Sequence, residues 1–193
     1  MNTEVSPNVS ERLQFIELVN PQLYFQVVEF VADNQEFYKY LNVTATSLKA
    51  EIPSELKTVK DMLKYYVCFA GVNTRYGEEC YQNVKNNKLD KLTQKKRTII
   101  DDICKLPEIK TREEFSKIKV KGVGEGAINY VLQHYFNDQN VAYPTDRIFQ
   151  RGIKKIYNLE KVTVAQCKKI VNSWKGSKSI GSMFCFQVAH YVN

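Results

Sequence analysis

Apolar residues recur every three or four positions along most of the chain, which is the spacing of one face of an α-helix. The clearest such stretch covers residues 58–70 and ends at Gly71. No stretch alternates apolar and polar residues as a half-buried strand does. We therefore predict an all-α fold, with helices over about 7–20, 21–31, 58–70, 78–85, 89–106, 112–118, 125–136, 146–156, 163–174 and 180–191.

Two of these helix starts carry a capping-box pattern, in which a threonine is followed three positions later by Glu or Gln. The pairs are Thr111 with Glu114 and Thr163 with Gln166. Residues 42–53 contain several poor helix formers and end in a proline, so we predict a connection there.

The stretch around which the chain is organised runs from Val120 to Arg151. Its first part holds three closely spaced glycines, Gly122, Gly124 and Gly126, between two apolar helices. Glycine lets the backbone approach a partner closely. Amides at the N-terminus of a helix bind anions readily. For a basic protein, we expect that anion to be a nucleic-acid phosphate.

The 193 residues carry 28 Lys and Arg against 21 Asp and Glu, a net charge of +7. This excess alone is weak evidence for a polyanionic partner. The cluster Lys95–Arg97 has two interpretations, a solvated helix face or a DNA-facing patch. No run approaches the roughly 18 apolar residues of a membrane span, and Met1–Pro7 does not resemble a signal peptide. We therefore expect an intracellular protein that is neither secreted nor bound to a membrane.

Cysteine and histidine usage argues against a zinc site. The five cysteines are scattered, odd in number and never in a Cys-x-x-Cys pair, so neither a disulfide framework nor zinc is indicated. We expect most of them to be buried free thiols. The two histidines, His134 and His190, lie among apolar residues without a Cys or Asp partner at motif spacing, and we interpret both as structural.

The helix, Gly-Val-Gly turn and helix, followed by an aspartate, resemble the helix–hairpin–helix DNA glycosylase superfamily. The family's hairpin has the sequence Leu-Pro-Gly-Val-Gly, and the matching residues here are Val120–Gly124. Asp146, with Arg151 five positions later, matches the family's aspartate and arginine. The resemblance is specific across residues 97–155 and looser elsewhere.

This resemblance implies two helical lobes with a DNA-binding cleft between them and a helix–hairpin–helix motif at about 112–136. One lobe would comprise residues 55–135, and the other residues 1–54 plus 136–193. It also implies a monomer that binds double-stranded DNA. The activity would be removal of a damaged or mispaired base by hydrolysis of the N-glycosidic bond, the first step of base excision repair.

The catalytic residue implied by the resemblance is Asp146. Its carboxylate would stabilise the cation-like sugar and orient or deprotonate the attacking water. The residues themselves also allow a purely structural role, because Asp is common as a helix N-cap. Thr145 is an alternative cap at the same helix start.

Gly126 implies a monofunctional enzyme, because bifunctional family members carry a nucleophilic lysine at this position. Lys121 occupies the position of the hairpin proline, and we expect it to contact phosphate. A bifunctional 8-oxoguanine-type glycosylase and lyase that uses a displaced lysine stays as an alternative. A non-catalytic DNA-binding protein, in which Asp146 is only a cap, is the second alternative.

Further contacts follow from the resemblance. The hairpin amides and the pair Lys178 and Ser179 would bind phosphates. Asn73 would fill the gap left by the flipped base, although an ordinary turn asparagine is the preferred interpretation. The segment that starts at Trp174 resembles the alkylpurine branch and favours alkylated purines such as 3-methyladenine. Trp174 itself fits either the core or a pocket wall.

We expect no required cofactor. In the family a monovalent cation, K⁺ or Na⁺, sits on hairpin carbonyls, which here would be those of Ile118, Val120 and Val123. An iron–sulfur cluster is not expected, because only Cys167 and Cys185 follow the hairpin and such a cluster needs four cysteines.

Overall fold

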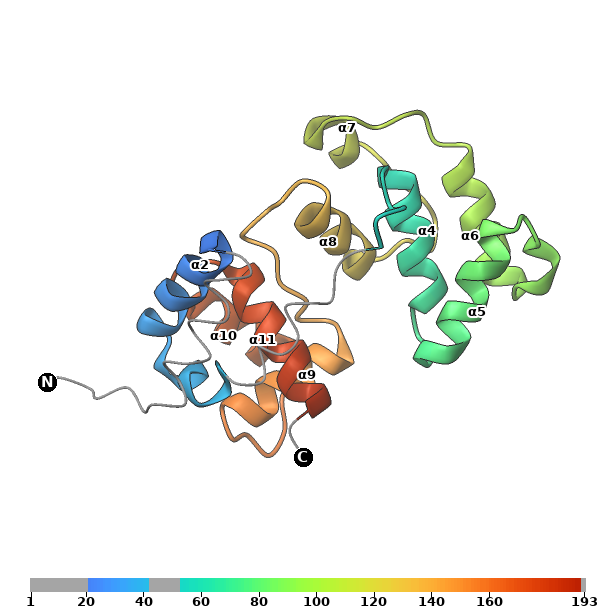
Figure 1. Ribbon diagram of the computed structural model, residues 1–193. Coiled ribbons are helices and arrows are strands. Elements are labelled where there is room, and N and C mark those ends of the chain that lie inside the picture. The colour runs from blue at the N-terminus through green and yellow to red at the C-terminus, as the bar shows by residue number, and fades with distance from the viewer. Residues whose placement is uncertain (1–20, 42–52, 192–193) are drawn as a thin grey trace, which may run out of the picture. The chain divides into compact units, whose positions relative to one another are not determined.

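The computed structural model of the chain describes residues 21–41 and 53–191. All of its regular elements within those residues are helices, so the described fold is all-α (Figure 1). The helix predicted over 7–20 lies outside the described residues, as does the connection predicted over 42–53 except for Pro53.

The chain divides into two compact units. One unit is Ile52–Asp138, and the other joins Met1–Glu51 to Gln139–Asn193. The unit boundaries fall after Glu51 and after Asp138.

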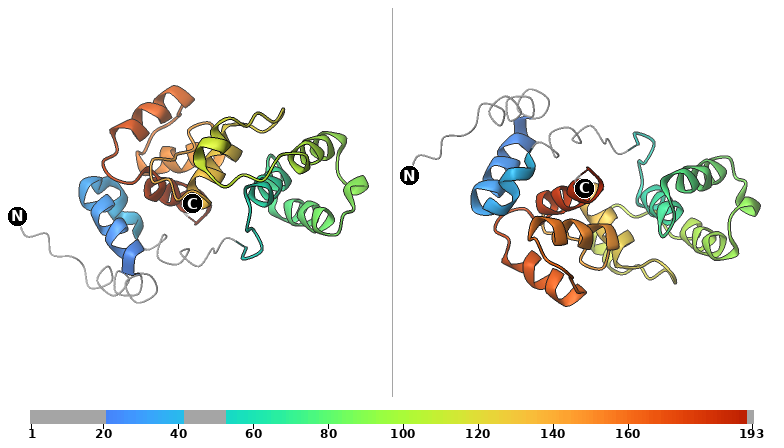
Figure 2. Two further views of the ribbon diagram at one scale, coloured as in Figure 1. Left: turned by 90° about the horizontal axis from the view of Figure 1, so that it is seen from above. Right: turned by 90° about the horizontal axis from the view of Figure 1, so that it is seen from below.

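The Ile52–Asp138 unit is built around one helix, α4, which packs against α5, α6 and α8 (Figure 2). Its largest fully buried side chains are Val59, Leu63, Ile100, Ile103 and Val131, which come from three of these helices. The elements of this unit are α4 (Val59–Phe69), α5 (Thr74–Lys85), η2 (Leu89–Lys91), α6 (Gln94–Cys104), α7 (Arg112–Ser116) and α8 (Glu125–His134).

The start and the buried face of helix α4 both follow from its local sequence. Thr58 caps its start, because the side-chain oxygen accepts a hydrogen bond from the amide of Asp61 at 3.1 Å. Its buried positions Val59, Met62, Leu63 and Val67 follow helical spacing and supply the apolar face.

The end of α4 is held by a lysine from another helix. The Nζ of Lys96 donates hydrogen bonds to the carbonyls of Val67 at 2.6 Å, Cys68 at 2.7 Å and Ala70 at 3.3 Å. These carbonyls are left without intrahelical partners at a helix C-terminus, where the helix dipole also favours a cation. Lys96 is 9% exposed. Both interpretations of the Lys95–Arg97 cluster are therefore wrong for Lys96, which is neither solvated nor available to DNA.

The second unit brings together segments from both ends of the chain. Helix α2 lies beside α11, although more than 140 positions separate them in the printed sequence. The elements of this unit in the described residues are α2 (Pro21–Asp33), η1 (Gln35–Tyr40), α9 (Arg147–Ile156), α10 (Val164–Ser173) and α11 (Lys178–Tyr191).

Aromatic rings form the core of this unit. Phe37 makes edge contacts with the rings of Trp174 and Phe184, with centroids 5.4 and 5.3 Å apart. Helices α9 and α11 form the closest packed pair, because Gly152 lies against the backbone of Cys185. Any side chain at position 152 would overlap that backbone, so the glycine permits the close approach.

Most predicted helices are present, with differences at their starts. The two capping boxes, Thr111 with Glu114 and Thr163 with Gln166, are confirmed. Helix α5 begins at Thr74, earlier than the predicted 78, because Asn73 caps it by accepting from the amide of Tyr76. The helix predicted from residue 89 is interrupted: a short 3₁₀ turn precedes α6, which starts after Thr93.

Four of the five cysteines are buried free thiols and Cys104 is exposed. Burial raises the pKa of the Cys68 thiol to about 12, and that of Cys167 to about 11. Such thiols stay protonated and unreactive at neutral pH. None of the helices that the structure describes is both long and apolar enough to cross a membrane.

Candidate functional site

The glycine hairpin joins α7 to α8. Gly122 adopts a φ of +91°, which residues with a Cβ rarely adopt. A Cβ at this position would also lie 2.7 Å from Cδ1 of Ile99 on α6. Gly122 is therefore required by the fold of the hairpin itself.

Gly124 differs from Gly122, because the fold gives no reason for a glycine there. Its φ of −94° is open to any residue, and a Cβ would meet nothing within 4 Å. Gly124 is the N-cap of α8 and provides no side-chain hydrogen bond. Helices α4, α5, α6, α7, α9 and α10 all have a capping side chain at the same position.

The missing cap leaves amide donors at the start of α8. Within the described residues, the backbone N–H groups of Gly124, Glu125 and Gly126 have no acceptor. Unpaired N–H groups at a helix N-terminus, with the positive end of the dipole behind them, suit an anion. Lys121 is exposed in the same hairpin. The hairpin therefore has the chemistry to bind a phosphate.

Gly126 has a structural reason of its own. The hydroxyl of Tyr66, on α4, lies where a Cβ of residue 126 would begin. A lysine at this position would overlap the tyrosine unless the ring moved. Sequence reasoning missed Tyr66, because the two positions are 60 residues apart and no pattern links them.

Aromatic side chains surround this contact. The ring of Tyr130 lies 5.5 Å from that of Tyr66 and 4.5 Å from that of His134. Burial lowers the pKa of His134 to about 4. The imidazole is therefore neutral at physiological pH, as expected for a structural histidine.

The backbone carbonyl oxygens of the hairpin are uncharged, and such oxygens are suitable ligands for a monovalent cation. The carbonyl of Val120 also accepts the N–H of Val123 at 3.1 Å, which leaves it one lone pair.

Beside the hairpin is an open pocket of about 400 Å³ with mainly apolar walls. Its lining includes Leu63, Phe115, Val123 and Ile128.

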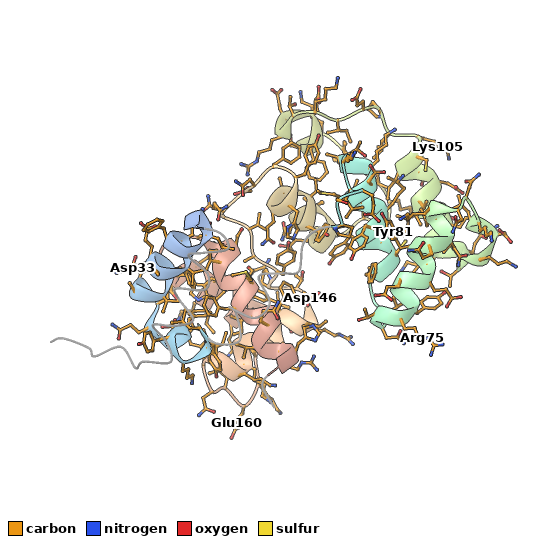
Figure 3. All side chains as sticks on the ribbon, in the orientation of Figure 1. Asp33, Arg75, Tyr81, Lys105, Asp146 and Glu160 are labelled. Carbon is orange, nitrogen blue, oxygen red and sulfur yellow. The ribbon has the colours of Figure 1, made fainter. Side chains whose placement is uncertain are left out.

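Asp146 stands at the start of α9 in the other unit (Figure 3). Its Oδ1 accepts the backbone N–H groups of Ile148 at 2.7 Å and Phe149 at 3.0 Å. The residue is the N-cap and not the first helical residue, and the alternative that Thr145 caps this helix is wrong. Within the described residues Oδ2 has no hydrogen-bond partner, and the side chain is partly exposed.

The two oxygens of Asp146 therefore have different environments. Two amides fix Oδ1 and with it the plane of the carboxylate. Oδ2 is left able to accept a proton or to face a positive charge. The capping role and a catalytic role, which were alternatives from the sequence, are compatible in this geometry.

Three other predicted site residues form hydrogen bonds within the protein. Ser179 is 6% exposed, and its amide donates to the carbonyl of Gln139 at 3.1 Å. That placement argues against a phosphate contact through Ser179. Lys178 starts α11 with its Nζ 3.4 Å from Oδ1 of Asn172. Asn73 is the cap of α5, which accounts for its residue type.

Trp174 belongs to the core. Its Nε1 donates to the hydroxyl of Tyr157 at 2.8 Å, and that hydroxyl donates to Glu36. The tryptophan is 6% exposed, and its ring packs on Phe37. The interpretation of Trp174 as a core residue is confirmed, and its ring is not available for stacking on a base.

Among the described residues, no group of three or more His, Cys, Asp or Glu side chains is placed to hold a metal ion.

Comparison of the chain with protein-family models, curated proteins and solved structures found no match.

Proposed function

We propose that this protein is a monofunctional DNA glycosylase, which removes a damaged or mispaired base by hydrolysing its N-glycosidic bond. The observation that carries the proposal is the carboxylate of Asp146, held by Oδ1 and open at Oδ2. The uncapped hairpin at α8 supports it independently, because it suits a DNA phosphate.

The chemistry requires little more than one oriented carboxylate. As the bond between C1′ and the base nitrogen breaks, its electron pair leaves with the base and the sugar gains positive charge. The negative charge of Asp146 stabilises that sugar, and Oδ2 accepts a proton from the attacking water. The water oxygen forms the new bond to C1′. A neutral base takes up the proton that Asp146 received from the water, whereas a cationic base such as 3-methyladenine leaves as a neutral molecule and Asp146 releases its proton to solvent. The products are the free base and an abasic site.

The hairpin would hold the DNA strand through the amides of Gly124, Glu125 and Gly126, with Lys121 adding charge. Carbonyls of Ile118, Val120 and Val123 would hold K⁺ or Na⁺, which would add positive charge next to a phosphate. The hairpin and Asp146 belong to different units, so the proposal requires one duplex to contact both. The target base must leave the stack to reach the carboxylate.

Gly126 favours hydrolysis over strand cleavage. A lyase needs an amine that attacks C1′ and forms a Schiff base. Position 126 has no side chain, and the hydroxyl of Tyr66 fills the space beside it. Lys121 is the hairpin amine next to the glycines, and we assign it to phosphate. Alkylated purines stay our preferred substrate class through the resemblance of the segment after Trp174, although the buried ring itself provides no stacking surface.

The test is a panel of duplexes that each contain one lesion or mispair, including 3-methyladenine, 8-oxoguanine, uracil and mispaired adenine. We expect base release from at least one duplex by the wild type and none by Asp146→Asn. A covalent adduct after borohydride trapping on abasic DNA would identify a lyase instead. DNA binding without release from any duplex would favour the non-catalytic protein, in which Asp146 is only a cap.

A further inference from the structure

The net charge of this protein is concentrated in one part of the chain. Residues 139–193 hold nine Lys and Arg but only two acids, Asp146 and Glu160, which gives +7. Residues 1–138 hold 19 basic and 19 acidic residues and are neutral. The basic excess therefore lies entirely in the segment that begins shortly before Asp146.

Helix α9 orders part of this charge into a stripe. Arg147, Arg151 and Lys154 lie at positions i, i+4 and i+7, which fall on one helix face. All three are exposed. The opposite face is buried and includes Phe149, Gly152, Ile153 and Ile156. Because Gly152 lies against the backbone of Cys185 in α11, the helix cannot turn this stripe inward.

These cations lack the partners that surface cations elsewhere in the chain have. In the Ile52–Asp138 unit, for example, Lys64 pairs with Asp61, Lys85 with Glu55 and Lys117 with Glu113. Across the described residues, Arg147, Arg151 and Lys154 form no ion pair. Helix α9 contains no acidic residue at all.

The arrangement is unfavourable for the isolated helix. Like charges at i and i+4 repel, and Arg147 stands in the first turn, at the positive end of the helix dipole. An anionic partner would remove both penalties. The stripe rises by about 1.5 Å per residue, hence roughly 10 Å from Arg147 to Lys154. That length corresponds to about three successive phosphates along the axis of one DNA strand.

We propose that the exposed face of α9, formed by Arg147, Arg151 and Lys154, binds the sugar–phosphate backbone of the DNA strand next to the base on which Asp146 acts. The proposal rests on the proposed function for the identity of the nucleic acid and of the catalytic carboxylate. This face of α9 would be a second phosphate-binding surface, separate from the glycine hairpin. It lies on the helix that Asp146 caps. This surface would position the sugar whose bond is broken.

The experiment compares two variants that each remove three positive charges. The test variant is Arg147→Gln/Arg151→Gln/Lys154→Gln. The matched control, Lys161→Gln/Lys168→Gln/Lys169→Gln, changes three exposed lysines of the same basic segment that lie outside α9. Gln is a good helix former, so both variants should fold, and circular dichroism checks this. Duplex affinity is then measured between 50 and 200 mM salt.

For the test variant, we expect the slope of log affinity against log salt to fall by about 2.7, or 0.9 for each lost phosphate contact. The control slope should change by less than 1. The wild type should lose roughly 40-fold more affinity than the test variant over this salt range. Arg147→Lys/Arg151→Lys, which keeps the charge, should retain most of the wild-type slope.

Equal changes in the two triple variants would overturn the proposal, because the effect would then come from net charge alone. An unchanged slope in the test variant would overturn it too, as would a wild type that does not bind DNA. Binding is measured separately from base release. A protein that binds through α9 but releases no base would contradict the proposed function and leave this inference standing.

Discussion

The hydroxyl of Tyr66 occupies the space into which a side chain on Gly126 would extend. Gly126 stands in the first turn of α8, at the position that matches the nucleophilic lysine of the lyases in the family that the hairpin resembles. The glycine is therefore accompanied by a partner that fills its side-chain space. Two features therefore exclude a lysine amine from position 126: the glycine itself, and the Tyr66 hydroxyl that packs beside it.

Replacing Gly126 by Ala should destabilise the protein by about 1–3 kcal/mol, because the new methyl group overlaps the Tyr66 hydroxyl. In a Tyr66→Phe background the hydroxyl is absent and most of this loss should disappear. Alanine also gains up to about 1 kcal/mol over glycine in a helix. Chemical denaturation of the four proteins of this double-mutant cycle measures the coupling. A coupling near zero would contradict the described contact.

Gly124→Ala should weaken DNA binding roughly tenfold, because a methyl group would obstruct a phosphate held by the amides of α8. Stability should fall by about 1 kcal/mol or less, since the position is open and alanine is only a poorer cap. The control is Thr163→Ala, which removes the cap of α10 and leaves the hairpin unchanged. Equal affinities for the wild type and Gly124→Ala would exclude these amides as the phosphate site.

Lys96→Met should destabilise the protein by about 1–3 kcal/mol, because the three carbonyls at the end of α4 lose their donor. The neighbouring Lys95 is exposed, so Lys95→Met should change the free energy of unfolding by less than about 0.5 kcal/mol. Urea titration of both variants makes the comparison. Similar values for the two lysines would contradict the capping role.

The burial of Lys96 illustrates what the sequence does and does not predict. Its spacing from Ile99, Ile100 and Ile103 is helical, and the structure has all four on the buried face of α6. Its charge favoured solvent instead. Only the tertiary contact with the end of α4, supplied from a helix 30 residues earlier, resolves this conflict.

His134 should make stability depend on pH. Its pKa in the folded protein is about 4, below its ordinary value of 6.5, so between these values only the unfolded chain binds the proton. The free energy of unfolding should therefore fall as the pH drops from 6.5 towards 4, by up to about 3 kcal/mol. Urea titrations across this range should show a flatter profile for His134→Phe.

Local patterns predicted the helices well, because caps and apolar spacing act within a few residues. Both capping boxes and the boundaries of α4 followed from such short-range signals. The contact of Tyr66 with Gly126 did not, since it depends on how α4 packs against α8. Asp146 was predicted in part. Its role as a cap was one of two roles that the sequence indicated, but only the folded structure shows that Oδ1 accepts both amides and Oδ2 accepts neither.

The capping role and the proposed catalytic role of Asp146 can be separated by substitution. Asn is as good an N-cap as Asp, so Asp146→Asn should keep the bonds to Ile148 and Phe149 and the stability of the protein. Asp146→Ala should lose about 0.5–2 kcal/mol of stability through the missing cap. Both variants lack the carboxylate.

The most direct measurement is single-turnover base release from the best duplex of the lesion panel, at saturating protein. We predict that Asp146→Asn binds that duplex as tightly as the wild type and unfolds at the same denaturant concentration. We also predict that its rate of base release falls at least a hundredfold, within the range of a lost general base. Base release by Asp146→Asn at the wild-type rate would contradict the assignment of Asp146 as the catalytic carboxylate.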